Sequence, residues 1–216
     1  MGEVIGSVAP LAMAVAVSPV PIIGVILMLL GRHARTTSVG YAFGWVVGIV
    51  VAMTLFVVVG EVARAGATAI AWIQVVLGVV LFLEGVRQWL RRRKSEGIQT
   101  WLSAVDGMRP AAGTALGFVL AAMNPKNLLL CIAAGILVGG APLSIASSAL
   151  VIAGFTVIAS SSVVIPVVAY RIFTESISGI LRHVEKWLES NAAAILATLT
   201  LIIGVVLIGN GIAELA

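Results

Sequence analysis

The sequence predicts an all-α polytopic membrane protein, with six transmembrane helices arranged as two inverted three-helix repeats and with proline-broken first and fourth helices. Three observations lead to this prediction: the composition, the number of apolar stretches and the place of two proline motifs. Of 216 residues, 61% are hydrophobic and only 10% charged. A soluble domain carries about 45–50% apolar and about 25% charged residues, and disorder requires low hydrophobicity. The composition therefore excludes both classes.

The apolar residues form six stretches, at roughly 4–30, 38–60, 68–90, 113–139, 144–170 and 191–213. A helical crossing takes about 20 apolar residues, so six crossings fill the chain and leave room only for connections. We therefore expect a single transmembrane domain over residues 1–216. Its first repeat covers about 1–90, a cytoplasmic loop about 91–112 and its second repeat about 113–216.

The basic residues predict the orientation of this domain. Of the thirteen Lys and Arg, eleven lie in or beside the first, third and fifth connections, Arg64 lies in another connection, and Lys126 lies within a span. The eleven are Arg32, Arg35, Arg87, Arg91, Arg92, Arg93, Lys94, Arg109, Arg171, Arg182 and Lys186. Cytoplasmic loops of membrane proteins are rich in Lys and Arg, so we expect both termini on the extracytoplasmic side. Beside spans, these charges meet anionic headgroups, and no nucleic-acid partner is expected.

The two halves resemble each other at an offset of 106 residues. This offset aligns Ser18-Pro19 with Asn124-Pro125, Ser38 with Ser144, and Gly48 with Gly154. Each half has three spans, an odd number, so the halves must be inverted relative to each other. Inverted repeats with interrupted helices recur among secondary transporters, whose substrate sites lie near the bilayer midplane. The architecture therefore favours transport.

The first proline motif is Ser18-Pro19-Val20-Pro21. A proline inside a helix costs about 3 kcal/mol, but the cost nearly vanishes in the first turn of a new helix, where amide donors have no partner. Ser18 would then be the N-cap, with Pro19 and Pro21 in the first turn. We expect the first span to break near residue 18. The alternative is a proline kink that binds no ligand.

The second motif, Asn124-Pro125-Lys126-Asn127, lies at the centre of the fourth span. Again an N-cap residue precedes a proline at the first helical position. An ammonium at the bilayer centre costs at least about 2.5–3.5 kcal/mol, and such groups usually face the bundle interior or a cavity. Lys126 is therefore a candidate functional residue. The alternative is a structural lysine paired with carbonyls that the helix break frees.

If the halves are inverted, both half-helices begin near the midplane, and both positive dipole ends face the membrane centre. Together with Lys126 they form a site suited to a carboxylate, sulfate or phosphate. The expected substrate-binding or translocation residues are Ser18, Pro19, Pro21, Asn124, Pro125, Lys126 and Asn127. Lys126 could instead exchange a proton during transport, and Glu84 is a second possible proton site. The alternative for Glu84 is an ion pair with Arg87, three residues along the helix.

No enzymatic chemistry is expected. The membrane interior lacks paired carboxylates and a His-bearing triad, and the chain has no phosphate-binding G-x-x-x-x-G-K-[ST] loop. The single cysteine and two distant histidines, Cys131, His33 and His183, give no metal-ligand spacing. We therefore expect neither a metal nor a cofactor.

With its Pro-rich break in the first span and Asn124-Pro125-Lys126 in the fourth, the chain resembles the lysine-exporter (LysE) superfamily. Amino-acid exporters of that superfamily typically carry Pro-Gly-Pro, whereas this chain has Pro19-Val20-Pro21. That difference, the run from Ala16 to Ile23 and the later Gly44-Trp45 are similar to an actinobacterial branch. This branch comprises the peptidoglycolipid-addressing (GAP) or sulfolipid-addressing proteins. The resemblance implies a multi-pass protein of the bacterial cytoplasmic membrane that helps to deliver glycolipids to the cell surface.

The leading hypothesis is a secondary transporter that exports an anionic amphiphile, a cell-envelope glycolipid or its precursor. One alternative is an exporter of amino acids or small cations, with a compact closed pocket in place of a lateral opening for acyl chains. Another is a non-transporting accessory protein that scaffolds lipid export machinery. The expected partners are membrane lipids, the substrate, a lipid-synthesis or export protein, and a second copy of the chain packed through Gly-rich faces.

Overall fold

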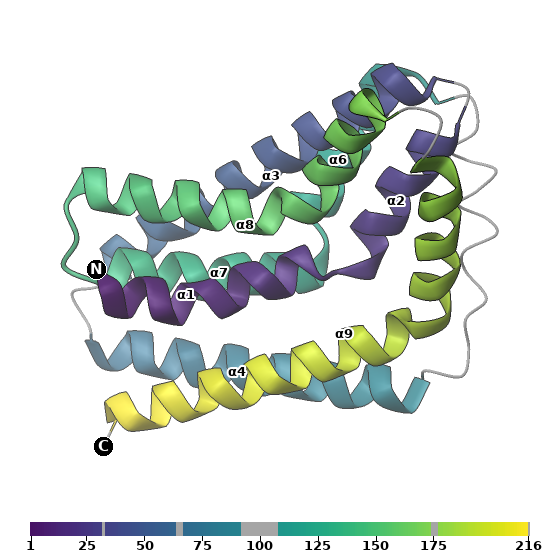
Figure 1. Ribbon diagram of the computed structural model, residues 1–216. Coiled ribbons are helices and arrows are strands. Elements are labelled where there is room, and N and C mark those ends of the chain that lie inside the picture. Colours follow the sequence, from purple (N-terminus) through teal and green to yellow (C-terminus); the bar gives the residue numbers. More distant parts are fainter. Residues whose placement is uncertain (32, 64–66, 92–107, 174–176, 216) are drawn as a thin grey trace.

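In the computed structural model, residues 1–31, 33–63, 67–91, 108–173 and 177–215 are described, and all their regular elements are α-helices (Figure 1). Arg32, Arg64, Arg92, Arg93, Lys94 and most of the predicted cytoplasmic loop lie outside these residues. The helices are α1 (Gly2–Ala16), α2 (Pro19–Leu30), α3 (Ala34–Ala63), α4 (Ala67–Arg91), α6 (Pro110–Ala122), α7 (Pro125–Gly140), α8 (Ile145–Ile172) and α9 (Ile177–Leu215).

The structure breaks the first and fourth apolar stretches where the proline motifs predict. The axes of α1 and α2 differ by 46°, and those of α6 and α7 by 58°. Both α2 and α7 begin with a proline at the first helical position. Proline there removes only an amide that would lack an intrahelical partner. The predicted proline-broken helices are confirmed.

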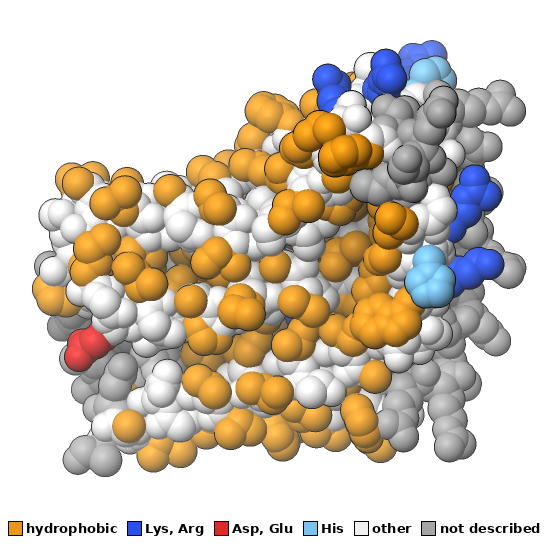
Figure 2. Space-filling model, in the orientation of Figure 1, with side chains coloured by type: hydrophobic (Ala, Val, Ile, Leu, Met, Phe, Trp, Pro, Cys, Tyr) orange, Lys and Arg blue, Asp and Glu red, His pale blue; other side chains and the backbone are white. Residues whose placement is uncertain are grey.

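Four helices are long and apolar enough to cross a membrane, and the count rises to six if each bent pair is one span. Large apolar side chains are exposed along these helices, for example Phe43 at 64% and Val157 at 71%. Figure 2 shows such side chains over most of the visible face. Since water-soluble monomers rarely expose large continuous apolar patches, this surface supports a membrane protein.

The connection expected after the fifth apolar stretch is largely helical, because α9 already begins at Ile177. Figure 1 shows the first part of α9 crossing the end of the helix bundle before the helix turns to run along it. Leu181 and Leu188 are buried two turns apart, whereas Arg182 and Lys186 are exposed. This segment is amphipathic, and its charges concealed its helical character in the hydropathy pattern.

We expect this first part of α9 to lie at the level of the lipid headgroups. Ile180 and Trp187 are 61% and 54% exposed beside the exposed basic residues, and an apolar stripe next to Lys and Arg is typical of interfacial helices. A spin label on Trp187→Cys, in a Cys131→Ala background, should report an intermediate depth in vesicles. A label on Val206→Cys, within the apolar span Ala194–Ala213, should be deeper. Equal depths at the two positions would contradict this placement.

Two hydrogen bonds bring the basic connections to one end of the bundle. The Arg171 guanidinium donates to the Arg35 carbonyl oxygen at 3.3 Å, and the Thr37 hydroxyl donates to the Met108 carbonyl oxygen at 3.1 Å. Lys and Arg side chains gather at this end (Figure 2), and both termini lie at the other (Figure 1). The described parts of the first, third and fifth connections thus share one end, as the charge pattern predicts.

Candidate functional site

The two helix breaks meet through Lys126. Its ammonium donates a hydrogen bond to the carbonyl oxygen of Ala14 at 3.3 Å, and Ala14 lies in the last turn of α1. Figure 1 shows the breaks near the middle of the bundle, with α2 and α7 running from there toward opposite ends. The structure therefore brings Lys126 of the second motif to the end of α1, just before the first motif.

The residues around Lys126 explain how α7 begins. Asn124 is the N-cap of α7, and its side-chain oxygen accepts from the Lys126 amide at 3.1 Å. Pro125 follows at the first helical position. Ser18 is the N-cap residue of α2 but makes no side-chain cap hydrogen bond. The two predicted caps thus differ, since only Asn124 satisfies an amide of its helix.

The prolines leave few amide donors at the two helix starts. Pro19, Pro21 and Pro125 have no N–H, and the Lys126 amide already donates to the Asn124 side chain. By position, the amides of Val20 and Asn127 lack an acceptor within their own helices. The Lys126 ammonium and the positive dipole ends of α2 and α7 therefore supply most of the attraction for an anion.

Lys126 and Asn127 are both buried, with 9% and 0% of their surface exposed. The Asn127 side-chain amide donates to the Leu120 carbonyl oxygen at 3.1 Å, whereas its side-chain oxygen is buried without a hydrogen-bond partner. Among the side chains that the structure describes, no carboxylate pairs with Lys126. The site thus combines a buried cation with a free buried acceptor, and buried groups of this kind usually have partners.

Tyr41 is a residue of the site that the sequence analysis did not single out. Its hydroxyl donates to the Pro21 carbonyl oxygen at 3.1 Å and so links α3 to the first turn of α2, where Ser18, Pro19 and Pro21 are buried. Gly24 makes room for the ring, because a Cβ there would lie 2.9 Å from the Tyr41 hydroxyl. In the sequence, Gly24 one turn after the helix start indicated a close contact, but it did not show which residue makes that contact.

Glu84 is held by residues of its own helix. Its carboxylate lies 3.7 Å from the Arg87 guanidinium and accepts from the Gln88 side-chain amide at 3.3 Å. The Glu84 side chain is 41% exposed. This is the ion pair given as the alternative to a proton site. Both of its polar partners lie on α4, so these bonds do not link it to the Lys126 site.

The chain matches no curated protein and no solved structure. A family model described as "Sap, sulfolipid-1-addressing protein" matches residues 8–213. This match agrees with the branch that the proline motifs indicated, while membership of the wider LysE superfamily stays a prediction. Because the match covers nearly the whole length of the chain, including both helix breaks and Lys126, the protein belongs to the sulfolipid-1-addressing protein family.

Proposed function

We propose that the protein is a secondary transporter that moves an anionic amphiphile, a cell-envelope glycolipid or its precursor, toward the cell surface. The description of its family names a sulfolipid, and a sulfated lipid has the charge that the site attracts. The observation that carries the proposal is the burial of the Lys126 ammonium between the start of α7 and the end of α1, with no described carboxylate beside it. Burying a charge is costly unless something compensates it, and the substrate headgroup is the proposed compensation.

The magnitudes support a headgroup at Lys126. One of the three ammonium donors is used by Ala14, which leaves two for a ligand. At a separation of about 4 Å and an effective dielectric constant of about 20, two opposite unit charges attract by about 4 kcal/mol. This attraction is of the same order as the cost of at least about 2.5–3.5 kcal/mol for a lone ammonium in the bilayer centre. The free side-chain oxygen of Asn127 could accept from a sugar hydroxyl.

The helix packing supports the proposed pair of inverted repeats. α3 packs against the broken pair α6 and α7, and α8 packs against the broken pair α1 and α2. α4 and α9, the last helices of the two halves, pack against each other. In an inverted repeat α3 corresponds to α8, and the pair α1 and α2 corresponds to α6 and α7, so these contacts are counterparts of one another. In this proposal the bundle has six spans in the bacterial cytoplasmic membrane, with its basic end in the cytoplasm and both termini outside.

An ion gradient is the proposed energy source, with Lys126 or Glu84 as the proton site. A substrate headgroup that binds Lys126 would compete with its bond to Ala14. Because Ala14 belongs to the first half of the chain and Lys126 to the second, this exchange would couple binding to the contact between the halves. Such relative movement of repeats is how inverted-repeat transporters expose a central site in turn to each side.

One observation favours the alternative of a non-transporting accessory protein. The Lys126–Ala14 hydrogen bond is the contact that a purely structural lysine would make with a carbonyl freed at a helix break. In that case Lys126 would stabilise the fold and no solute would pass. An exporter of amino acids or small cations remains the other alternative, and a site whose charge is the Lys126 ammonium fits an amino-acid carboxylate but not a cation.

Flux in sealed proteoliposomes under a proton gradient tests the proposal. A labelled sulfated glycolipid and labelled amino acids would be followed in parallel for the wild type, Lys126→Ala and the matched control Lys186→Ala. Lys186 is exposed on α9. We expect glycolipid flux to fall about tenfold or more in Lys126→Ala, which corresponds to about 1.4 kcal/mol or more, and to persist in Lys186→Ala. Flux of amino acids alone would favour the amino-acid exporter. If the wild type moved neither solute and co-purified with a partner protein, the accessory protein would be favoured.

A further inference from the structure

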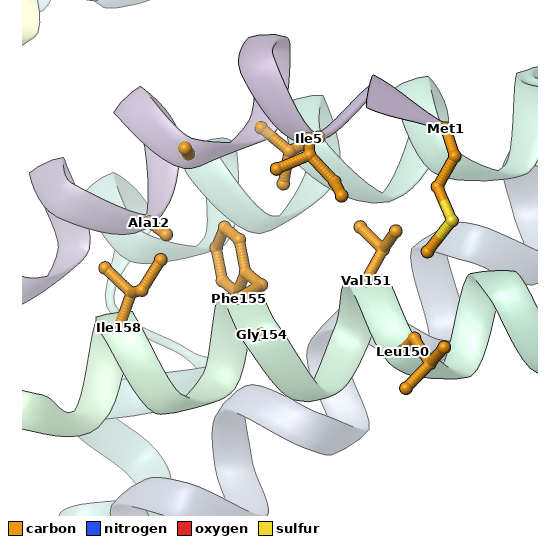
Figure 3. A pocket seen from close by; sticks show the side chains of 10 residues that line it. Met1, Ile5, Ala12, Leu150, Val151, Gly154, Phe155 and Ile158 are labelled. Carbon is orange, nitrogen blue, oxygen red and sulfur yellow. The ribbon is translucent and has the colours of Figure 1, made fainter. Parts of the chain in front are cut away.

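A groove between α1 and α8 is lined by apolar residues and is distinct from the Lys126 site (Figure 3). Its volume is about 280 Å³, and every residue that lines it is apolar: Met1, Ile5, Val8, Ala9, Ala12, Leu150, Val151, Gly154, Phe155 and Ile158. Met1 and Leu150 lie at one end in Figure 3, and Ala12 and Ile158 lie at the other. The groove has the lateral position between helices that a substrate with acyl chains requires.

The groove ends close to the Lys126 site along α1. Its inner end, at Ala12, is two residues from Ala14, whose carbonyl oxygen accepts from Lys126. From Met1 to Ala12 the helix rises by about 16 Å, at about 1.5 Å per residue. A ligand with a charged end at Lys126 could therefore lay an extended apolar chain along α1.

We propose that this groove holds an acyl chain of the amphiphile whose anionic headgroup binds at Lys126. The inference rests on the proposed function and adds the site for the tail. A small polar solute finds no hydrogen-bonding side chain in the groove. A helix of a second copy, about 10–12 Å across with its side chains, is too wide for this volume. A flexible hydrocarbon chain fits both the shape and the chemistry.

The short distance along α1 from the groove to Ala14, the partner of Lys126, also separates this tail from an ordinary membrane lipid. Bilayer tails are as apolar as the groove, so apolar contact alone gives no preference for one lipid over another. Preference arises when the tail is tethered to a headgroup that a specific group holds. Lys126 is that group, so an amphiphile with a negative headgroup should bind in preference to a neutral one with the same tail.

Gly154 allows the groove to be filled without disturbing the helices. A Cβ added at Gly154 meets no atom within 4 Å, and the residue lines the groove. Gly154→Leu should therefore place its side chain in the space proposed for the acyl chain. Gly209→Leu is the matched control, because Gly209 lies on α9 and a Cβ there also meets nothing within 4 Å. Both changes replace a helical glycine by leucine and raise helix propensity alike.

The test measures binding of two 6-sulfated glucosides, one with a hexadecyl and one with a butyl chain, to the full chain in nanodiscs. We expect Gly154→Leu to weaken hexadecyl binding about tenfold or more and to leave butyl binding unchanged, while Gly209→Leu alters neither. Unchanged hexadecyl binding in Gly154→Leu, or an equal loss for both ligands, would overturn the acyl-chain site.

Two further arms separate this inference from the proposed function. Lys126→Ala should weaken both sulfated ligands. If it weakens neither, the headgroup site is wrong, and the tethered tail is overturned with it. If it weakens both while Gly154→Leu weakens neither, the proposed function survives and only the acyl-chain site fails. Uncharged hexadecyl glucoside should bind the wild type more weakly than its sulfated form. Equal binding would show an ordinary lipid contact and would overturn the claim that a headgroup at Lys126 holds the acyl chain in the groove.

Discussion

Replacing Gly117 by Leu is expected to prevent α3 and α6 from packing and to abolish the stable fold. A Cβ at Gly117 would overlap the carbonyl oxygen of Tyr41 and lie 3.0 Å from the Trp45 amide nitrogen. Both of these atoms belong to the backbone of α3, so no side-chain rotation relieves the overlap. Overpacking of a well-packed core costs about 1–3 kcal/mol, occasionally more, and a backbone neighbour places this change at or above the upper end of that range.

Purified Gly117→Leu should elute as aggregate in gel filtration and show no cooperative thermal transition by intrinsic fluorescence. Gly209→Leu is again the matched control and should melt as the wild type does, because its Cβ meets open space. A Gly117→Leu protein that is monodisperse and melts with the control would contradict the close contact of α3 with α6.

The same contact shows what the glycines of this sequence do. Gly40, Gly44 and Gly48 recur every fourth residue on α3 and face Pro110, Thr114, Phe118 and Ala121 of α6, whereas Gly113 and Gly117 on α6 face α3 in return. Small residues at this spacing let two helix backbones approach closely. The spacing is visible in the sequence, but it names no partner helix. The glycine-rich faces suggested a homodimer, and the structure uses these five within one chain; a dimer stays a prediction.

The helix breaks were predictable because their cause is local. Proline lacks an amide donor and is tolerated in the first turn of a helix, and Asn124 before Pro125 is a capping residue by chemistry alone. The first part of α9 was not predictable in this way, because its charged residues interrupt the hydropathy pattern. Only the structure shows that Leu181 and Leu188 of this segment are buried. Its helical state depends on the surface on which it packs.

The partners within the site were beyond local reasoning. The sequence places Lys126 and Ala14 112 residues apart, and only the juxtaposition of the two breaks brings the ammonium to that carbonyl oxygen. Tyr41 and Pro21 are linked in the same way across two helices. The charge of Lys126 and its depth in a span were visible, whereas its hydrogen-bond partner depends on tertiary structure. The sequence therefore offers candidate residues for the site, whereas their contacts depend on the tertiary structure.

Lys126→Met is expected to abolish glycolipid flux while changing the free energy of unfolding by only about 1 kcal/mol, because two opposing terms nearly cancel. The variant loses the bond to Ala14, and a hydrogen bond from a charged donor contributes about 1.5–3 kcal/mol. It also avoids burying an ammonium in the bilayer centre, which costs about 2.5–3.5 kcal/mol. Methionine is unbranched and flexible, so it can follow the path of the lysine stem.

Denaturant unfolding of Lys126→Met and of the control Lys186→Met, together with flux in proteoliposomes, measures both quantities on the same protein. A structural lysine predicts the opposite pattern, in which Lys126→Met unfolds far more easily and any loss of flux follows the loss of fold. Retained stability with lost flux would show that the ammonium acts in transport, on the solute or as the proton site, and does not serve mainly to hold the helices together. In the empty protein the bond to Ala14 offsets most of the cost of the buried ammonium, and a bound anionic headgroup would replace that bond as the partner of Lys126.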